Sequence, residues 1–555
     1  MNAVRKALGP QGVPVEPDSR PAVIVVAGSL AANIEATQQA LVERGDIFQQ
    51  GARLVRVVRE NTPKGRKGIR RHAGELRTLA VTADWLQAYA TQHVAFLGRK
   101  AGRPTGADGT PELKPIDCPR RVAAGIIANA GAWPFPYLRG ISTAPTLRND
   151  GSILEAEGYD QETSLYLDFG GELFPPVPSQ PTLEDSKAAL ARVYTGVYAH
   201  FPFVKPEHRA VALALPLTAA VRHALRTAPA FAVSATTMGT GKSLLVDASC
   251  MISTGVPAPS VAYTPDEAEM QKRMVAVLIE SAPYLSIDNI DLPVESSILC
   301  SALTQPTIKG RILGETATVT ASTATTVTLT GNNLQVSGDM STRVVQVELD
   351  AGVERPEDRE FAKNLYEWVP ANRASLVVDL LTVLRAFVVA GRPPQAFTRW
   401  GRFEEWSDVV RSALVWTGEA DPVMTRDEVQ AGDPVKAALG AVLAAWDAAL
   451  GKGFVTAGRL VECALQTSSL APYDPLHPQL REALAEIAGD VRGGLSARRL
   501  GKWLAKYDGR IQDGRRIERG EDRQGIATWR VGSVGSVGLC LSMGKNYLEE
   551  RKEFL

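Results

Sequence analysis

The sequence has few cysteines, and none of them lies at the spacing of a metal or redox site. Cys118, Cys250, Cys300, Cys463 and Cys540 are scattered over 555 residues. Because they form no C-x-x-C pair, a zinc ribbon or a redox dithiol of that pattern is excluded. A scattered, odd set is typical of a reducing compartment. The six histidines show no ligand spacing either, so we expect no metal held by histidine or cysteine.

Long apolar runs and an excess of one charge are also missing. No stretch approaches the roughly 18 consecutive apolar residues of a membrane helix. The first residues lack the apolar core of a signal peptide. We therefore expect a cytoplasmic protein with no membrane partner. Lys plus Arg and Asp plus Glu both number 61, so any attraction to nucleic acid must come from local basic patches.

The length and the pattern of turns predict a multidomain α/β protein. At roughly 150 residues per domain, the chain has room for about three to four domains. We expect a flexible arm at 1–20, an N-terminal α+β accessory domain at 21–200, a P-loop core at 201–350, a helical domain at 351–450, a winged helix at 451–535 and a tail at 536–555.

The strongest motif is a glycine loop between an apolar strand, Ala230–Ala235, and an apolar helix. Glycines let backbone N–H groups approach phosphates, and the helix N-terminus adds its positive end. Lys242 suits the β- and γ-phosphates, and the Ser243 hydroxyl suits Mg²⁺. The usual first glycine is replaced by Thr236. The implied cofactors are ATP and Mg²⁺, and the predicted contacts are Thr237, Met238, Gly239, Thr240, Gly241, Lys242, Ser243 and Leu244.

Three later positions complete a candidate hydrolytic site. Asp288 ends a short apolar strand and would hold magnesium with Ser243. Asn332 follows the β-branched segment TVTLT and would sense the γ-phosphate or place water; the alternative for this position is a simple hairpin turn. Arg343 precedes another strand and would meet the nucleotide of a neighbouring subunit, with an ion pair to Asp339 as the alternative.

Two basic segments are candidates for DNA contact. Lys309 and Arg311 lie in a hairpin-like stretch between the acid and the amide. Arg498, Arg499 and Lys502 lie on a predicted helix within residues 491–530, which hold eleven Lys and Arg residues against five Asp and Glu. A basic helix beside a basic β-ribbon suits contact with phosphates and entry into a groove. The alternative is a winged helix that binds protein and leaves these cations in solvent.

In combination, these motifs resemble a known family. The order G-T-G-K-S, I-D-N, a hairpin, T-G-N-N and G-D-M-S-T-R is similar to AAA+ ATPases of the superfamily three helicase type. The sequences of these motifs are most similar to those of the helicase-like replication proteins of phages, prophages and plasmids. Sequence segments on either side of these motifs extend the resemblance over residues 20–530. Two of them are A-P-T-L-R-N-D-G-S-I-L-E-A-E-G-Y-D and F-E-E-W-S-D-V-V-R-S-A-L-V-W-T-G-E-A-D-P.

The resemblance implies a ring, commonly a hexamer, with ATP sites between subunits in a bacterial cell. One subunit would supply the catalytic and magnesium-binding groups Lys242, Ser243, Asp288 and Asn332. Its neighbour would supply Arg343 as an arginine finger. Hairpins in the channel would grip single-stranded DNA through Lys309 or Arg311. The role of the first 200 residues stays open among binding DNA, recruiting a primase or polymerase, and bracing the ring.

Two positions depart from the family pattern. Many relatives carry a second acid, the base for the attacking water, directly after the acid that binds magnesium. Here that position is Asn289, with Asp291 and Glu280 as nearby alternatives. Relatives often end the finger motif with Arg-Arg, whereas Thr342 precedes Arg343 here.

The motifs favour a DNA-dependent ATPase that acts as a replicative helicase of a mobile element. The alternative is a DNA-binding initiator or helicase loader in which ATP drives assembly with little unwinding. Asn289 fits the slow hydrolysis of such a switch. A P-loop enzyme acting on small molecules, such as a kinase, is the third class. Arg343 and the basic C-terminal segment argue against it.

Overall fold

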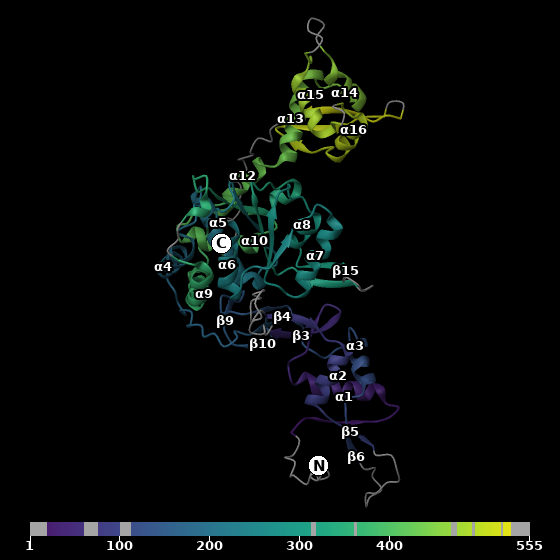
Figure 1. The fold of residues 1–555 in the computed structure, drawn as a ribbon, viewed down its shortest axis with the longest axis vertical. Helices are drawn as coiled ribbons and strands as arrows, with labels where there is room; N and C mark the ends of the chain where they lie inside the picture. Colours follow the sequence, from purple (N-terminus) through teal and green to yellow (C-terminus); the bar gives the residue numbers. More distant parts are fainter. Residues whose placement is uncertain are drawn as a thin grey trace, which may run out of the picture. The chain divides into compact units, whose positions relative to one another are not determined.

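The computed structural model describes residues 19–59, 76–99, 113–311, 318–359, 363–467, 474–490, 494–522 and 525–533. They belong to two compact units (Figure 1). The core unit comprises Met1–Leu334 and Thr342–Arg426. The C-terminal unit comprises Gln335–Ser341 and Asp427–Leu555. Among the described residues, no helix is long and apolar enough to cross a membrane.

The core unit is built around a parallel sheet of five strands in the order β13-β14-β17-β12-β18. The strands are β12 (Ala230–Ala235), β13 (Ser260–Ala262), β14 (Tyr284–Ile290), β17 (Thr326–Asn332) and β18 (Val344–Leu349). Near-continuous apolar and β-branched strands are typical of parallel sheets covered on both faces. Every residue of β12 is buried. The mixed α/β class predicted from the sequence is confirmed at this level.

Helices pack around this sheet, and the most buried of them, α5, is apolar on nearly every side. The helices are α4 (Leu183–Val193), α5 (Pro206–Val221), α6 (Lys242–Thr254), α7 (Glu267–Ile279), α8 (Ser297–Thr304), α9 (Leu365–Val389), α10 (Glu404–Trp406) and α11 (Ser412–Trp416). Two π-helical segments, η1 (Tyr194–Tyr198) and η5 (Ser407–Arg411), continue neighbouring helices, and three 3-10 turns are η2 (Arg222–Ala224), η4 (Pro356–Asp358) and η6 (Pro422–Met424). The chain then passes to the C-terminal unit within α12 (Thr425–Ala431).

A two-stranded antiparallel hairpin lies beside α7 in the core unit. It consists of β15 (Thr307–Arg311) and β16 (Thr318–Ser322), with Lys309 paired to Thr320. Ile308 and Val319 are buried against Val275 of α7. Alternation along the strand therefore places the Lys309 side chain on the exposed face.

The first part of the core unit, up to residue 167, carries four small sheets: β1-β5-β6, β2-β3-β4, β10-β11-β7 and β8-β9. Its elements are β1 (Ala22–Val25), α1 (Leu30–Val42), β2 (Phe48–Gln50), β3 (Arg53–Arg59), β4 (Leu76–Ala80), α2 (Ala83–His93), β5 (Ala95–Arg99), β6 (Leu113–Ile116), α3 (Arg120–Ala128), β7 (Gly140–Ser142), β8 (Thr146–Leu147), β9 (Ile153–Leu154), β10 (Gly158–Asp160) and β11 (Leu165–Leu167). Arg53 Nη2 and Thr78 Oγ1 both donate to the Ile279 carbonyl oxygen, at 2.8 and 3.0 Å. This region is thereby fixed to the end of α7.

The C-terminal unit packs four helices against an antiparallel sheet in the order β19-β22-β21-β20. Its elements are η3 (Gly338–Thr342), which ends in the core unit, α13 (Pro434–Leu450), β19 (Val455–Thr456), α14 (Ala457–Leu465), α15 (Pro478–Ala488), α16 (Ala497–Lys506), β20 (Ile511–Gln512), β21 (Arg515–Arg519) and β22 (Thr528–Ser533). Trp446, Leu460, Leu484, Leu500 and Trp529 share one buried core.

The boundary of this unit differs from the expected start at residue 451. Trp446 of α13 is fully buried in the core shared by α14, α15 and α16, so α13 belongs with them. The buried Asp433 caps the start of α13. It also accepts hydrogen bonds from Gly338 N and Ser341 Oγ, at 3.1 and 3.3 Å. These bonds bring Gln335–Ser341 into the unit, although the sequence placed that segment inside the 201–350 core.

Candidate nucleotide-binding site

The loop from β12 to α6 has the backbone of an anion-binding turn. Gly239 and Gly241 have φ of +74° and +102°, values that favour glycine. Gly241 is the N-cap of α6, and no side chain caps the first turn of the helix. The N–H groups there are consequently available to phosphate oxygens. Thr240 Oγ1 braces the loop by donating to the Thr237 carbonyl oxygen at 2.8 Å, and Met238 at the tip is 76% exposed.

Lys242, the first residue of α6, is held across the mouth of this loop. Its Nζ donates to Asn332 Oδ1 at 2.5 Å and to the Thr237 carbonyl oxygen at 3.5 Å. Burial lowers the pKa of the Lys242 ammonium, and the nearby Asp288 carboxylate opposes that shift. A partly desolvated ammonium with only neutral oxygen partners gains strongly from an incoming anion.

Ser243 and Asp288 bring hard oxygen atoms together beside the loop. Ser243 Oγ donates to Asp288 Oδ1 at 3.2 Å. Thr330 Oγ1 of β17 and the Asn289 backbone N–H also donate to Asp288 Oδ1, so the carboxylate is oriented from two strands. A hydroxyl and a carboxylate beside a phosphate site form a donor set that fits Mg²⁺.

Parallel pairing explains why these side chains meet. β14 and β17 are neighbours, β17 pairs with β12, and Asn332 lies opposite Ala235, the last residue before the loop. Carboxyl ends of parallel strands share one edge of a sheet, which is where ligands bind in open α/β folds. The structure thus brings together Lys242, Ser243, Asp288 and Asn332.

The residues considered as the base for water lie at different ends of β14. Glu280 precedes the strand, and its carbonyl oxygen accepts from Thr78 N at 3.2 Å. β14 spans about 20 Å at ~3.3 Å per residue, so Glu280 is remote from Asp288. Asp291 follows the strand directly and is exposed. Asn289, at a register shift with φ of +57°, is exposed beside Asp288.

Arg343 is not gathered into this constellation. It precedes β18, and its carbonyl oxygen accepts from Ala230 N at the start of β12, the opposite edge of the sheet. The side chain is only 5% exposed, and Nη1 donates to Thr342 Oγ1 at 3.3 Å. A finger that reaches a neighbour's nucleotide would need this guanidinium to become accessible.

The residues expected to contact DNA fall in both units. Lys309 is exposed on β15, and the side chain of Arg311 lies outside the described part of the structure. Arg498, Arg499 and Lys502 are exposed along α16, where Arg499 Nη1 donates to the Gly489 carbonyl oxygen at 2.5 Å.

The cations of the adjacent β-ribbon are held in ion pairs. Arg516 and Arg530 both pair with Glu518 at 2.7 Å, and these two guanidinium groups hold the pKa of Glu518 below its usual range. Arg515 pairs with Asp447 at 3.1 Å. On α16, by contrast, Arg498 and Lys502 have no carboxylate partner among the described residues.

Sequence reasoning missed three residues at the loop. Thr330 holds Asp288, and a polar residue two positions before Asn332 on the same strand is a signal that could have revealed it. Phe201 and Glu357 lie against Gly241 and Gly239, respectively. They come from distant segments, and nothing in the local sequence indicates those contacts.

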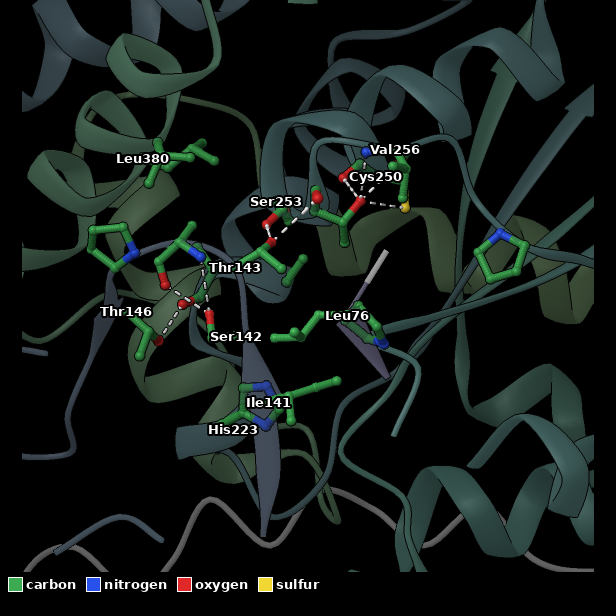
Figure 2. Close-up of a pocket in the computed structure, with 18 residues that line it drawn as sticks. Leu76, Ile141, Ser142, Thr143, Thr146, His223, Cys250, Ser253, Val256 and Leu380 are labelled. Carbon is green, nitrogen blue, oxygen red and sulfur yellow. Dashed lines mark hydrogen bonds between the residues drawn. The ribbon is translucent and has the colours of Figure 1, made fainter. Parts of the chain in front are cut away.

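A separate cavity of about 50 Å³ lies between β7, the end of α6 and α9 (Figure 2). At one side of the cavity, Thr143 Oγ1 donates hydrogen bonds to the Ser253 and Thr254 carbonyl oxygens. Burial, aided by Arg139 and Arg222, lowers the pKa of His223 to about 4. Its described lining includes no Asp, Glu, Lys or Arg, so this cavity lacks the groups of a phosphate site.

No family model and no curated protein matches the chain. Among solved structures, the apo C-terminal region of phage NrS-1 is similar at 11% identity and a TM-score of 0.34, over 76% of this chain and 92% of that chain. JCV helicase with a bound thiazolopyridine compound is similar at 12% identity and a TM-score of 0.22, over 45% of this chain and 66% of that chain. At these scores neither likeness assigns a fold or a function, which rest on the chain's own geometry.

Proposed function

We propose that this protein is a DNA-dependent ATPase of the AAA+ type that drives replication of a phage or other mobile element. The observation that carries the proposal is the convergence of Lys242, Ser243, Asp288 and Asn332 at the carboxyl ends of three neighbouring strands. The central strand order, with the acid strand and the amide strand on the same side of β12, supports a P-loop ATPase over a chance glycine turn.

In this proposal, the glycine loop would bind the phosphates of ATP, and Ser243 and Asp288 would hold Mg²⁺. The ion would neutralise charge that develops on the phosphate oxygens. Lys242 exchanges the Asn332 amide oxygen for the β- and γ-phosphates. Asn332, once released, is positioned to orient the attacking water. Thr330 keeps the Asp288 carboxylate aligned with Ser243 throughout.

A base must accept the proton of the attacking water, and the carboxylate that does so lies outside the set Lys242, Ser243, Asp288 and Asn332. An amide cannot accept that proton at neutral pH, so Asn289 can orient water but cannot serve as the base. Asp291 is the nearer of the two carboxylates on this segment, because Glu280 lies at the other end of β14. Asp291 is therefore assigned as the candidate base.

The DNA contacts complete the proposal. The exposed Lys309 on the β15–β16 hairpin would hold single-stranded DNA, together with Arg311. Arg498, Arg499 and Lys502 on α16 would contact duplex phosphates in a winged-helix manner. A homo-hexameric ring with Arg343 acting in the neighbouring site would couple hydrolysis to movement along the strand. A primase or polymerase would bind elsewhere on such a ring.

A second candidate function is an ATP-switched initiator or helicase loader, which the amide at position 289 favours. The two functions differ in strand displacement. We expect the protein to release a labelled strand from a forked duplex only with ATP and Mg²⁺, and Lys242→Ala to release none. ATP-dependent binding to the fork without release would favour the loader. Neither binding nor release would contradict both.

A further inference from the structure

The P-loop has two sides, and the groups described above occupy only one of them. β14 and β17, which carry Asp288 and Asn332, lie on one side of β12. β18 lies on the other side, and the chain that follows it forms η4 (Pro356–Asp358). A triphosphate that faces Lys242 and the Ser243–Asp288 pair leaves the β18 side of the loop for the nucleoside.

Two side chains meet the loop on that β18 side. Glu357 approaches Gly239 so closely that a Cβ there would lie 2.8 Å from Glu357 Oε2 and 3.2 Å from the Glu357 backbone nitrogen. Phe201 approaches Gly241, where a Cβ would lie 3.3 Å from the Phe201 ring. A side chain at position 239 or 241 would crowd this pair, so the two glycines let Glu357 and Phe201 approach the loop.

The backbone holds both side chains at this edge. Three contacts join residues 200–204 to the end of β18 and to the chain after it. They are Val204 N to the Glu348 carbonyl oxygen at 3.1 Å, Asp350 N to the Pro202 carbonyl oxygen at 2.9 Å, and Arg359 Nη2 to the His200 carbonyl oxygen at 2.7 Å. Phe201 and Glu357 consequently belong to one braced edge rather than to two independent loops.

The chemistry of the pair fits a ribonucleoside. Phe201 is partly exposed, and an aromatic ring beside the loop can stack on a base. Glu357 is exposed and makes no hydrogen bond or ion pair among the described residues. A carboxylate so close to a phosphate site is unfavourable, because the two negative charges repel each other, unless a hydrogen-bond donor of the ligand contacts the carboxylate. At other nucleotide sites, Asp and Glu carboxylates accept hydrogen bonds from ribose hydroxyls.

We propose that Glu357 accepts a hydrogen bond from the ribose 2′-hydroxyl and that Phe201 stacks on the base, so that the site selects ribonucleotides over 2′-deoxyribonucleotides. This inference rests on the proposed binding of nucleotide at the P-loop. It adds a nucleoside subsite that the sequence motifs do not contain. A protein that works on DNA in a cell would thereby take ATP in preference to dATP.

The test is competition of ATP and 2′-dATP against a fluorescent ATP analogue, with KM measured for both nucleotides. A hydrogen bond to a charged group is worth enough to give wild type a preference for ATP of about tenfold. Glu357→Ala should reduce the ratio of the two affinities to near one. Asp358→Ala is the matched control, because it removes a carboxylate from the next position of the same turn and should keep the ratio.

Phe201→Leu tests the second half of the proposal. It should weaken ATP and dATP together by about tenfold, because stacking on a base does not sense the 2′-hydroxyl. Competition by inorganic tripolyphosphate should stay unchanged. A wild-type ratio near one, or a Glu357→Ala ratio equal to that of wild type, would overturn the ribose contact while leaving the ATPase intact. If wild type binds no nucleotide at all, both the proposed ATPase function and the nucleoside subsite would be overturned.

Discussion

The proposed nucleotide site and the basic face of the C-terminal unit are fixed by different kinds of interaction. At the P-loop, adjacent residues take their geometry from one strand, one turn and one helix, as Lys242 and Ser243 do. In the C-terminal unit, the available charge depends on pairing in three dimensions: Glu518 shares its single charge between Arg516 and Arg530, and Asp447 pairs with Arg515 across 68 positions. A local motif is therefore a good guide to which side chains lie together, whereas a count of charges is a poor guide to a surface.

The largest expected effect comes from the metal side of the P-loop. Asp288→Asn should lower ATP turnover by at least about 100-fold, because the magnesium-binding set loses its charged oxygen. Turnover measured against Mg²⁺ concentration checks this. Glu280→Gln is the matched control at the other end of β14 and should turn over ATP normally. Equal losses in both variants would show that the strand is merely structural.

The sensor position should give the next largest effect. Asn332→Ala should lower turnover by about 10- to 100-fold and leave ATP affinity near wild type, since Lys242 loses only a neutral partner. Asn333→Gly alters the next amide, whose φ of +45° glycine accepts easily. Single-turnover kinetics and an equilibrium binding assay measure turnover and ATP affinity separately in both variants. Parallel loss of affinity in Asn332→Ala would argue against a sensor.

The C-terminal unit allows a direct test of paired against available cations. Arg498→Ala with Lys502→Ala should weaken duplex binding and reduce the salt slope of log K by about 1.8, at ~0.9 per phosphate contact. Arg516→Ala with Arg530→Ala removes the same charge from the ribbon and should reduce the slope less, because Glu518 holds both guanidinium groups and offsets one of their two charges. The opposite order would place the DNA contact on the ribbon.

The smallest effect concerns a group that burial, rather than an ion partner, keeps uncharged. The pKa of His223 is lowered to about 4, below the ~6.5 of an exposed imidazole. Between those values the unfolded chain binds more protons, so stability should be complete above about pH 6.5 and fall as the pH drops toward 4. Thermal unfolding across that window should be less pH-dependent in His223→Asn. An unchanged dependence would assign the acid loss to other groups.

The parts of the site that could be predicted are those set by sequence-local geometry or by strand order. Lys242 and Ser243 follow from the glycine turn, and Asp288 and Asn332 follow from their places after neighbouring parallel strands. Glu357 could not be predicted, because its approach to Gly239 depends on how the chain folds back after β18.

The parts of the fold that sequence missed have the same cause. Asp433 assigns Gly338 and Ser341 to the C-terminal unit through hydrogen bonds across more than 90 positions. The burial of Arg343 also arises from tertiary packing, whereas its local sequence had led us to expect an exposed finger. Alternation and motifs predict which residues share an edge or a face. They do not predict which long-range partner reaches that edge.

The central claim is that the P-loop constellation hydrolyses ATP in response to DNA. The most direct measurement is the steady-state ATPase rate of the full chain with and without single-stranded DNA, beside Lys242→Ala. We predict strong stimulation by DNA in wild type and no turnover in the variant, whose phosphate site has lost its ammonium. A rate that ignores DNA, or that survives Lys242→Ala, would contradict the claim.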